Sequence, residues 1–178
     1  MTIEIITPNA KLEWSHLISA VPEDSEFSAG KFETKIWISK DEKEFKKKLE
    51  NLMNEAVTEK WGANPPAKVT FAKISDGDLE SYTNDEGEVV FPNKGMFGIR
   101  AGSKRRPVVV DNTGSPITDE SSLGYTLRGN VKINCFGWEF GKTRKGVSIG
   151  LGAVMLTDLG VVTSSGGGIE GFEFQESA

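Results

Sequence analysis

The run Tyr125–Phe140 constrains the fold more than any other part of the chain. Its residues alternate with a period of two, which is the pattern of a strand buried on one face. One set of alternate positions, one parity of the strand, is apolar: Leu127, Val131, Ile133 and Cys135. The other parity mixes cations, amides and large rings: Arg128, Asn130, Lys132, Asn134, Phe136, Trp138 and Phe140. The run therefore predicts a long strand whose outer face is both basic and aromatic.

Positive charge is concentrated around this strand, although the whole chain is acidic, with a formal net charge of −5. Residues 94–151 hold ten basic and four acidic residues, a net +6, whereas the remaining residues hold 11 basic and 22 acidic ones, a net −11. The basic residues of the stretch are Lys94, Arg100, Lys104, Arg105, Arg106, Arg128, Lys132, Lys142, Arg144 and Lys145. Because local potential steers a ligand to a surface, the stretch predicts a face for an anionic partner.

A face of this composition suits an unpaired nucleic-acid strand. Cations follow the phosphates while aromatic rings stack on the bases, and each stacked base contributes about 1–3 kcal/mol. The alternative is structural, because rings in a strand also pack in cores and a helix can cover the outer face of a closed barrel. For any single ring the sequence leaves both interpretations open.

Length and composition predict one soluble, cytosolic domain. A chain of 178 residues with 37% hydrophobic residues can build one core and is too short for two comfortable ones. Cys135 is the only cysteine, so an intramolecular disulfide and a cysteine-based metal cage are excluded. The N-terminus lacks a signal-peptide pattern, and no apolar run reaches 18 residues, so we expect no membrane association. We expect a folded domain over residues 1–162 and a Gly-rich, then acidic and aromatic tail over 163–178.

Two strands are expected before the helix. Residues 11–21 form the first, which ends at Pro22, and Lys31–Ser39 forms the second. In the second strand, Glu33, Lys35 and Trp37 share the face opposite the apolar residues. Trp37 is therefore another stacking candidate, and a surface tryptophan covered by a loop is the alternative.

One long helix follows. Ser39 and Glu42 match a capping box, in which each side chain satisfies an amide at the start of the helix. Apolar residues then recur at helical spacing: Phe45, Leu49, Leu52, Met53, Ala56 and Val57. Gly62 and the prolines at 65 and 66 end the helix.

The segment Ser75–Glu88 contains six acidic residues and no basic one. Asp76 and Asp78 could bind a cation, but their spacing does not match a calcium loop, so we expect an exposed hairpin or loop that turns near Asp85–Gly87. Further strands are expected at 95–101, 108–111 and 147–159. In the last one, the face of Val147 is expected to include Met155, with a bend or bulge at Gly150 and Gly152.

Motifs for catalysis are absent from the sequence. It contains no Gly-rich phosphate loop, no Gly-x-Ser-x-Gly and no ligand set rich in His or Cys, and His16 is the only histidine. We therefore expect no enzymatic activity, no cofactor and no metal.

Five or so strands with one helix after an early strand pair predict a mainly β fold, a five-stranded Greek-key barrel of the OB type. At this point the sequence resembles the phage-encoded single-stranded DNA-binding proteins, OB-fold replication proteins of tailed phages. The resemblance covers roughly residues 11–168. It rests on the order and spacing of four segments: Lys31–Lys40 with the lysine-rich helix, Val108–Asp111 with a Gly-containing turn, Gly129–Asn134 with the aromatics after it, and Val147–Leu156.

The resemblance implies sequence-independent coating of single-stranded DNA during phage DNA replication and recombination, in the cytoplasm of the infected bacterium. From the residues, the expected DNA contacts are Lys35, Trp37, Arg100, Lys104, Arg105, Arg106, Arg128, Lys132, Phe136, Trp138, Lys142, Arg144 and Lys145. Relatives use an acidic tail ending in an aromatic to contact polymerase or helicase. The residues that resemble this element are Glu170, Phe172, Glu173 and Phe174, although the chain ends differently, in Gln-Glu-Ser-Ala. A homodimer is a further expectation.

Two alternatives remain open. The first is a non-catalytic barrel or sandwich module, such as a virion or assembly component, that uses its aromatics to bind protein or oligosaccharide. The overall acidity favours it and the charge asymmetry opposes it. The second is a nuclease-like enzyme that uses the acidic segment with a metal.

Overall fold

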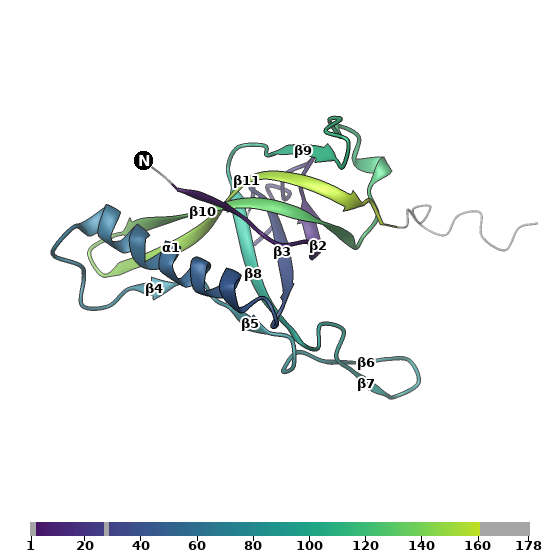
Figure 1. The fold of residues 1–178 in the computed structure, drawn as a ribbon, viewed down its shortest axis with the longest axis horizontal. Helices are drawn as coiled ribbons and strands as arrows, with labels where there is room; N and C mark the ends of the chain where they lie inside the picture. Colours follow the sequence, from purple (N-terminus) through teal and green to yellow (C-terminus); the bar gives the residue numbers. More distant parts are fainter. Residues whose placement is uncertain (1–2, 27–28, 161–178) are drawn as a thin grey trace, which may run out of the picture.

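The computed structural model describes residues 3–26 and 29–160 (Figure 1). Strands are the main regular structure of the described residues, and one long helix interrupts them. The elements in chain order are β1 (Glu4–Ile6), β2 (Ala10–His16), β3 (Phe32–Ser39), α1 (Lys43–Trp61), β4 (Thr70–Phe71), β5 (Ser75–Asp76), β6 (Tyr82–Thr83), β7 (Val89–Val90), β8 (Met96–Ser103), β9 (Val108–Asp111), a 3-10 turn (Glu120–Ser122), β10 (Leu127–Phe140) and β11 (Arg144–Asp158). The predicted mainly β fold with one long helix is confirmed.

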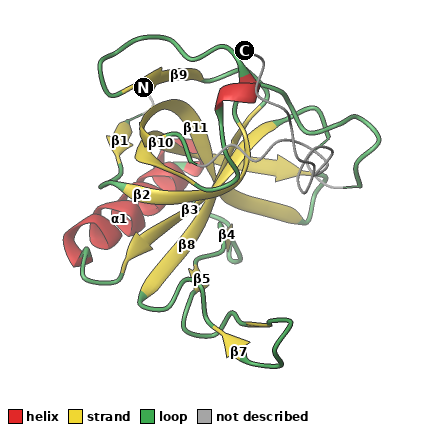
Figure 2. Cartoon of the chain, turned by 90° about the vertical axis from the view of Figure 1, so that its right-hand side faces the viewer, coloured by secondary structure: helices red, strands yellow, loops and turns green. Residues whose placement is uncertain are grey.

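Five strands form a closed ring in the order β10, β2, β3, β8, β11 and back to β10 (Figure 2). Neighbours are antiparallel except β8 and β11, which are parallel. These two strands meet at one register pair, Gly102 with Gly150. The predicted five-stranded Greek-key ring is therefore present, but its thin closure between β8 and β11 makes it an irregular barrel.

The helix α1 packs against β10 and β11 with the apolar stripe that its spacing predicts. Phe45, Leu49, Leu52, Met53 and Ala56 are buried. The predicted capping box is wrong: α1 begins at Lys43, and the N-cap residue Glu42 makes no side-chain cap. Instead, the Ser39 hydroxyl accepts a hydrogen bond from the backbone amide of Asp41 at 3.2 Å, so Ser39 stabilises the turn that precedes the helix. The helix ends at Gly62, as predicted.

The alternation predicted for β10 is confirmed, because Leu127, Val131, Ile133 and Cys135 are buried while the other parity is exposed or half-buried. In β11 the predicted alternation fails after Gly152. A bulge there shifts the register, so that Lys132 pairs with Ala153 but Ile133 pairs with Leu151. One extra residue moves all later side chains to the opposite face. Val154 and Leu156 are consequently buried, and Met155 is exposed rather than in the core.

The acidic segment forms the expected exposed hairpin. The strands β6 and β7 pair with each other and project from the ring (Figure 1). The amide of Asn84 donates to the carbonyl of Glu88, and Gly87 has a φ of 80°, which a glycine adopts easily. We call residues 79–92 the arm.

Within the described residues, no helix is long and apolar enough to cross a bilayer.

Candidate nucleic-acid interface

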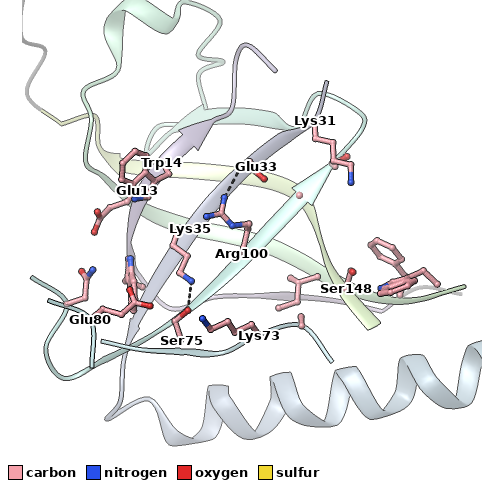
Figure 3. A pocket seen from close by; sticks show the side chains of 18 of the residues that line it. Glu13, Trp14, Lys31, Glu33, Lys35, Lys73, Ser75, Glu80, Arg100 and Ser148 are labelled. Atoms are coloured by element: carbon pink, nitrogen blue, oxygen red, sulfur yellow. Dashed lines mark hydrogen bonds and ion pairs between the residues drawn. The ribbon is translucent and has the colours of Figure 1, made fainter. Parts of the chain in front are cut away.

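One large groove crosses the outside of the ring over β2, β3 and β8 and reaches the β10–β11 hairpin (Figure 3). Its volume is about 1660 Å³, which is large enough for several nucleotides of an extended strand. The root of the arm and the segment that begins at Ala72 form one wall. We call this surface the central groove.

The floor of the groove depends on a glycine opposite a tryptophan. Trp37 of β3 and Gly98 of β8 are register partners. A Cβ atom built on Gly98 would lie 2.7 Å from the Trp37 ring and 2.8 Å from Cε of Lys35. The indole therefore lies across β8 only because residue 98 has no side chain.

This contact makes Gly98→Ala a sensitive substitution. We expect it to displace Trp37 and to lower the free energy of unfolding by about 1–3 kcal/mol, the usual cost of overpacking. Thermal unfolding of Gly98→Ala measures this packing effect. The control is Gly87→Ala, at a turn with a positive φ where an added Cβ meets nothing within 4 Å. A smaller loss for Gly98→Ala than for Gly87→Ala would contradict the assignment.

Of the two interpretations left open for Trp37, the structure favours a covered ring. Trp37 is only 4% exposed, although it lies on the polar face of β3 that the alternation predicted. The Nζ atom of Lys35 lies 5.1 Å from the centroid of the Trp37 ring and covers it. Trp37 thus supports Lys35 and offers little free ring surface for a base.

Exposed aromatic rings instead surround the floor. Their exposed fractions are 61% for Trp14, 54% for Tyr82, 58% for Tyr125, 44% for Phe136 and 69% for Phe140. All five side chains line the groove. Such rings can stack on bases of any sequence, since every base presents a π-face.

Trp14 reaches the groove through an irregularity of the backbone. Its φ of 51° makes it the one non-glycine residue with a positive φ in the described chain, and the pairing of β2 with β3 is irregular between Glu13 and His16. The Trp14 ring meets Tyr125 edge-on, with centroids 5.5 Å apart. A left-handed backbone at a bulky residue costs free energy and occurs preferentially at functional sites.

Six cations line the groove: Lys31, Lys35, Lys73, Arg100, Lys104 and Arg144. Four carboxylates lie among them: Glu13, Glu33, Glu80 and Glu139. Three of the four have a partner in the described structure: Nη1 of Arg100 is 2.9 Å from Glu33, Nζ of Lys11 is 2.9 Å from Glu13, and Nε1 of Trp61 donates to Glu139 at 2.5 Å. The groove therefore combines a positive excess with acids that are already engaged.

Lys35 is a half-buried cation on the groove floor. Burial lowers its pKa below the ordinary value, and the charges of Arg100 and Lys73 lower it further while Glu80 raises it. Its Nζ donates to the Ser75 hydroxyl at 2.6 Å (Figure 3). A phosphate would compensate the charge that the free protein disfavours.

We therefore expect Lys35→Met to separate stability from binding. A lowered lysine pKa destabilises the fold at neutral pH, and this cost disappears only as pH rises from the lowered pKa through the ordinary value. Methionine keeps the stem over Trp37, so the free energy of unfolding should rise or stay within about 1 kcal/mol, with Ser75 losing one hydrogen bond. Affinity for an oligonucleotide should fall. Denaturant unfolding measures the stability of the variant and titration measures its affinity. A parallel loss of stability and affinity would contradict this role.

The structure brings together seven of the thirteen residues predicted to bind DNA. Those in the groove are Lys35, Trp37, Arg100, Lys104, Phe136, Trp138 and Arg144. The other six lie outside it: Arg105, Arg106, Arg128, Lys132, Lys142 and Lys145. Parity identified the outward face of β10 correctly, but Arg128 and Lys132 lie on the half that pairs with β2 and β1, away from the groove.

Several groove residues were missed. Lys73 lies in a loop and Tyr82 in a two-residue strand, where no periodicity marks a shared face. Lys31 and Tyr125 begin two of the predicted alternating runs but lie just before β3 and β10, and neither was predicted to bind DNA. Trp14 was assigned to a strand without a special role, and no sequence signal predicts its positive φ. The tail residues Glu170, Phe172, Glu173 and Phe174 lie outside the described residues.

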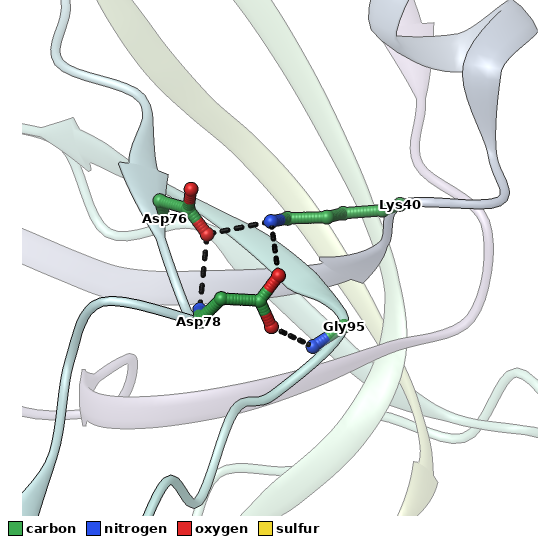
Figure 4. Close-up of polar contacts among 4 residues, drawn as sticks. All are labelled: Lys40, Asp76, Asp78 and Gly95. Atoms are coloured by element: carbon green, nitrogen blue, oxygen red, sulfur yellow. Dashed lines mark hydrogen bonds and ion pairs between the residues drawn. The ribbon is translucent and has the colours of Figure 1, made fainter.

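The acidic pair Asp76 and Asp78 has a structural partner. Nζ of Lys40 lies 2.6 Å from each carboxylate, and Asp78 also accepts from the amide of Gly95 at 2.7 Å (Figure 4). The hydrogen bonds from Lys40 hold the pKa of both carboxyls below the ordinary value. Among the described residues, no group of three or more acidic, His or Cys side chains could hold a metal ion. The pair anchors the root of the arm.

Comparisons with known proteins agree with this geometry. The sequence matches the family model described as "Enterobacter phage Enc34, ssDNA-binding protein" over residues 3–176. A search of curated protein sequences finds no match.

The fold is similar to solved structures of two phage proteins. The single-stranded DNA-binding protein from bacteriophage Enc34 in complex with ssDNA has a TM-score of 0.68 and 20% identity, over 90% of this chain and 89% of that one. The single-stranded DNA-binding protein gp2.5 encoded by bacteriophage T7 has a TM-score of 0.63 and 13% identity, over 100% of this chain and 98% of that one. At these identities the likeness establishes the fold.

Proposed function

The chain belongs to the family of the ssDNA-binding protein of Enterobacter phage Enc34, and we propose that it binds single-stranded DNA in the central groove, without sequence preference, during phage DNA replication and recombination. The observation that carries this proposal is the pairing of exposed rings with cations on one surface. Five rings are at least 44% exposed in a groove that six cations line. A soluble protein rarely exposes such rings without a ligand for them.

The two kinds of side chain have different tasks in this proposal. The cations neutralise phosphates and supply affinity that depends on salt, because each neutralised phosphate releases counterions. Trp14, Tyr82, Tyr125, Phe136 and Phe140 stack on bases, which are available only in an unpaired strand. A duplex hides its base faces and should bind more weakly.

Tryptophan fluorescence tests this function. Titration with poly(dT) should quench the emission, because Trp14 is 61% exposed in the groove, and the quenching should weaken at high salt. An equal amount of duplex should quench less. No response to either polymer would favour the alternative, a module that binds protein or oligosaccharide.

A pair of double variants tests the place of binding. Lys104→Ala with Arg144→Ala removes two groove cations and should reduce the slope of log affinity against log salt by about 1.4, since each phosphate contact on a single strand contributes about 0.7. Arg128→Ala with Lys132→Ala removes the same charge outside the groove and should change the slope less. An oligonucleotide that holds one copy is the substrate for both. If the second pair had the larger effect, the strand would follow the other surface.

Three finer expectations belong to the same proposal. The chain acts by binding and not by catalysis, it works in the cytoplasm of the infected bacterium, and residues 1–162 are its DNA-binding domain. The tail contacts a phage DNA polymerase or helicase through Glu170, Phe172, Glu173 and Phe174. Only the acidic and aromatic composition of these residues supports this contact. Pull-down of the polymerase with full-length chain and with Phe172→Ala/Phe174→Ala tests that contact.

A further inference from the structure

The arm exposes apolar side chains that nothing in the described structure covers. Leu79 is 79% exposed, Val89 is 62% exposed and Phe91 is 42% exposed. A two-stranded ribbon of this length is marginally stable on its own. An ordered ribbon with exposed apolar residues is therefore expected to have a partner surface.

The charge of the arm identifies the class of its partner. Its sequence contains Glu80, Asp85, Glu86 and Glu88 and no basic residue. The backbone amides of Glu86 and Glu88 donate to Oδ1 of Asn84, which fixes the turn and leaves the carboxylates exposed. Tyr82 of the arm lines the groove. The acids Asp85, Glu86 and Glu88 at the turn of the arm repel phosphate, so the partner of the turn is a basic protein surface with apolar residues.

This chain carries such a surface outside the groove. The register places Lys132 of β10 beside Ala153 of β11 and Ala153 beside Val108 of β9. Val108 is 65% exposed and Met155, two residues along β11, is 38% exposed. Arg105 and Arg106 are exposed in the turn that leads into β9, and neither has an ion pair with a described residue. We call Arg105, Arg106, Val108, Lys132 and Met155 the β9 face.

The arm and the β9 face lie at opposite ends of the molecule. Figures 1 and 2 are turned by 90° about the vertical, and in both the arm is at the bottom and β9 is at the top. One copy therefore cannot join its own two surfaces, but successive copies can join them head to tail. Such a heterologous contact does not close on itself and generates an open chain of subunits.

The direction of the groove agrees with this arrangement. The groove includes Tyr82 of the arm and Asn93, which precedes β8, and it includes Ser103 and Lys104 at the end of β8. In Figure 3, Glu80 lies at the lower left of the groove and Lys31 at its upper right, and the groove extends further to Ser148. The arm thus stands at one end of the groove, and the turn that carries Arg105 and Arg106 stands at the other. A head-to-tail contact would align the grooves of neighbouring copies along one strand.

We propose that the acidic arm of one copy docks on the β9 face of the next copy along the same DNA strand. This inference rests on the proposed function, since DNA holds the copies in line. It also assigns a role to Arg105, Arg106 and Lys132, three of the six predicted DNA-binding cations that lie outside the groove.

The test compares the full chain on two dT oligonucleotides, one that holds a single copy and one that holds two. The second copy should bind about tenfold more tightly than an independent copy, which corresponds to a few exposed ion pairs with apolar contact. Glu86→Lys with Glu88→Lys should abolish this gain and leave affinity for the one-copy oligonucleotide at least as high. Glu50→Lys with Glu55→Lys, on the exposed side of α1, changes the charge equally and should keep the gain.

A charge swap decides the partner surface. Arg105→Glu with Arg106→Glu should also abolish the gain, and a mixture of this variant with the arm variant should recover it on the two-copy oligonucleotide. Independent binding of two wild-type copies, an arm variant that keeps the gain, or a mixture that recovers none of it would each overturn the proposal. Failure of the wild type on the one-copy oligonucleotide would instead contradict the proposed function.

Discussion

Trp14→Ala is expected to weaken binding of a dT oligonucleotide about fivefold to 150-fold, the range of one lost stacking contact of about 1–3 kcal/mol. Trp14 is 61% exposed, and its ring contact is with Tyr125, whose ring is itself exposed. The free energy of unfolding should therefore change little. Alanine avoids the left-handed region as tryptophan does. The substitution therefore relieves no backbone strain at residue 14, where φ is 51°.

A matched control is available for this effect. Phe71 is 42% exposed and lies outside the groove, so Phe71→Ala removes a ring of similar exposure elsewhere. Fluorescence anisotropy of a labelled oligonucleotide measures both variants. Wild-type affinity in Trp14→Ala together with weak binding in Phe71→Ala would contradict the assignment of the stacking surface.

Arg100→Ala is expected to cost more than one phosphate contact. Arg100 holds Glu33 at 2.9 Å, and the side chain of Glu33 is only 11% exposed. The variant removes a cation and leaves an unpaired carboxylate in the path of the phosphates. We expect affinity to fall by more than about tenfold, because a charged hydrogen bond contributes about 1.5–3 kcal/mol and repulsion is added to its loss. Stability should fall as well, since Glu33 becomes a buried charge without a partner.

Glu33→Gln provides the opposite change at the same place. Glutamine keeps the shape of the side chain and releases the charge of Arg100 for phosphate, so affinity should rise. The double variant should recover part of the affinity that Arg100→Ala loses. Titration of the two single variants and the double variant, compared with the wild type at one salt concentration, gives the coupling energy between Arg100 and Glu33. A loss of affinity in Glu33→Gln equal to that in Arg100→Ala would mean that the pair serves only the fold.

Much of the fold could be predicted because its signals are local. The alternation in β10 identified the buried residues Val131 and Ile133, and the helical stripe from Phe45 to Ala56 identified the inner face of α1. The prediction was wrong where a local irregularity shifts the alternation of a strand or the start of a helix. The bulge at Gly152 moved Met155 out of the core, and the turn at Ser39 delayed the start of α1.

The site was less predictable because a barrel has several outer surfaces. Parity says that Lys132 and Phe136 both point outward from β10, but not that the strand carries one to the β9 face and the other to the groove. Alternation placed Trp37 on the correct face, beside Lys35, but did not show that its ring is buried there. The ring is buried because a register glycine on the neighbouring strand lets the indole lie across it. Such cross-strand contacts depend on the pairing of segments about sixty residues apart in sequence.

The most direct test of the account is ultraviolet crosslinking of a dT oligonucleotide to the full-length chain, with the modified residues identified by mass spectrometry. The account predicts adducts at the exposed groove rings, above all Trp14, Tyr82 and Phe136, and their loss at high salt. Adducts confined to residues outside the groove, such as those of the β9 face, would contradict it.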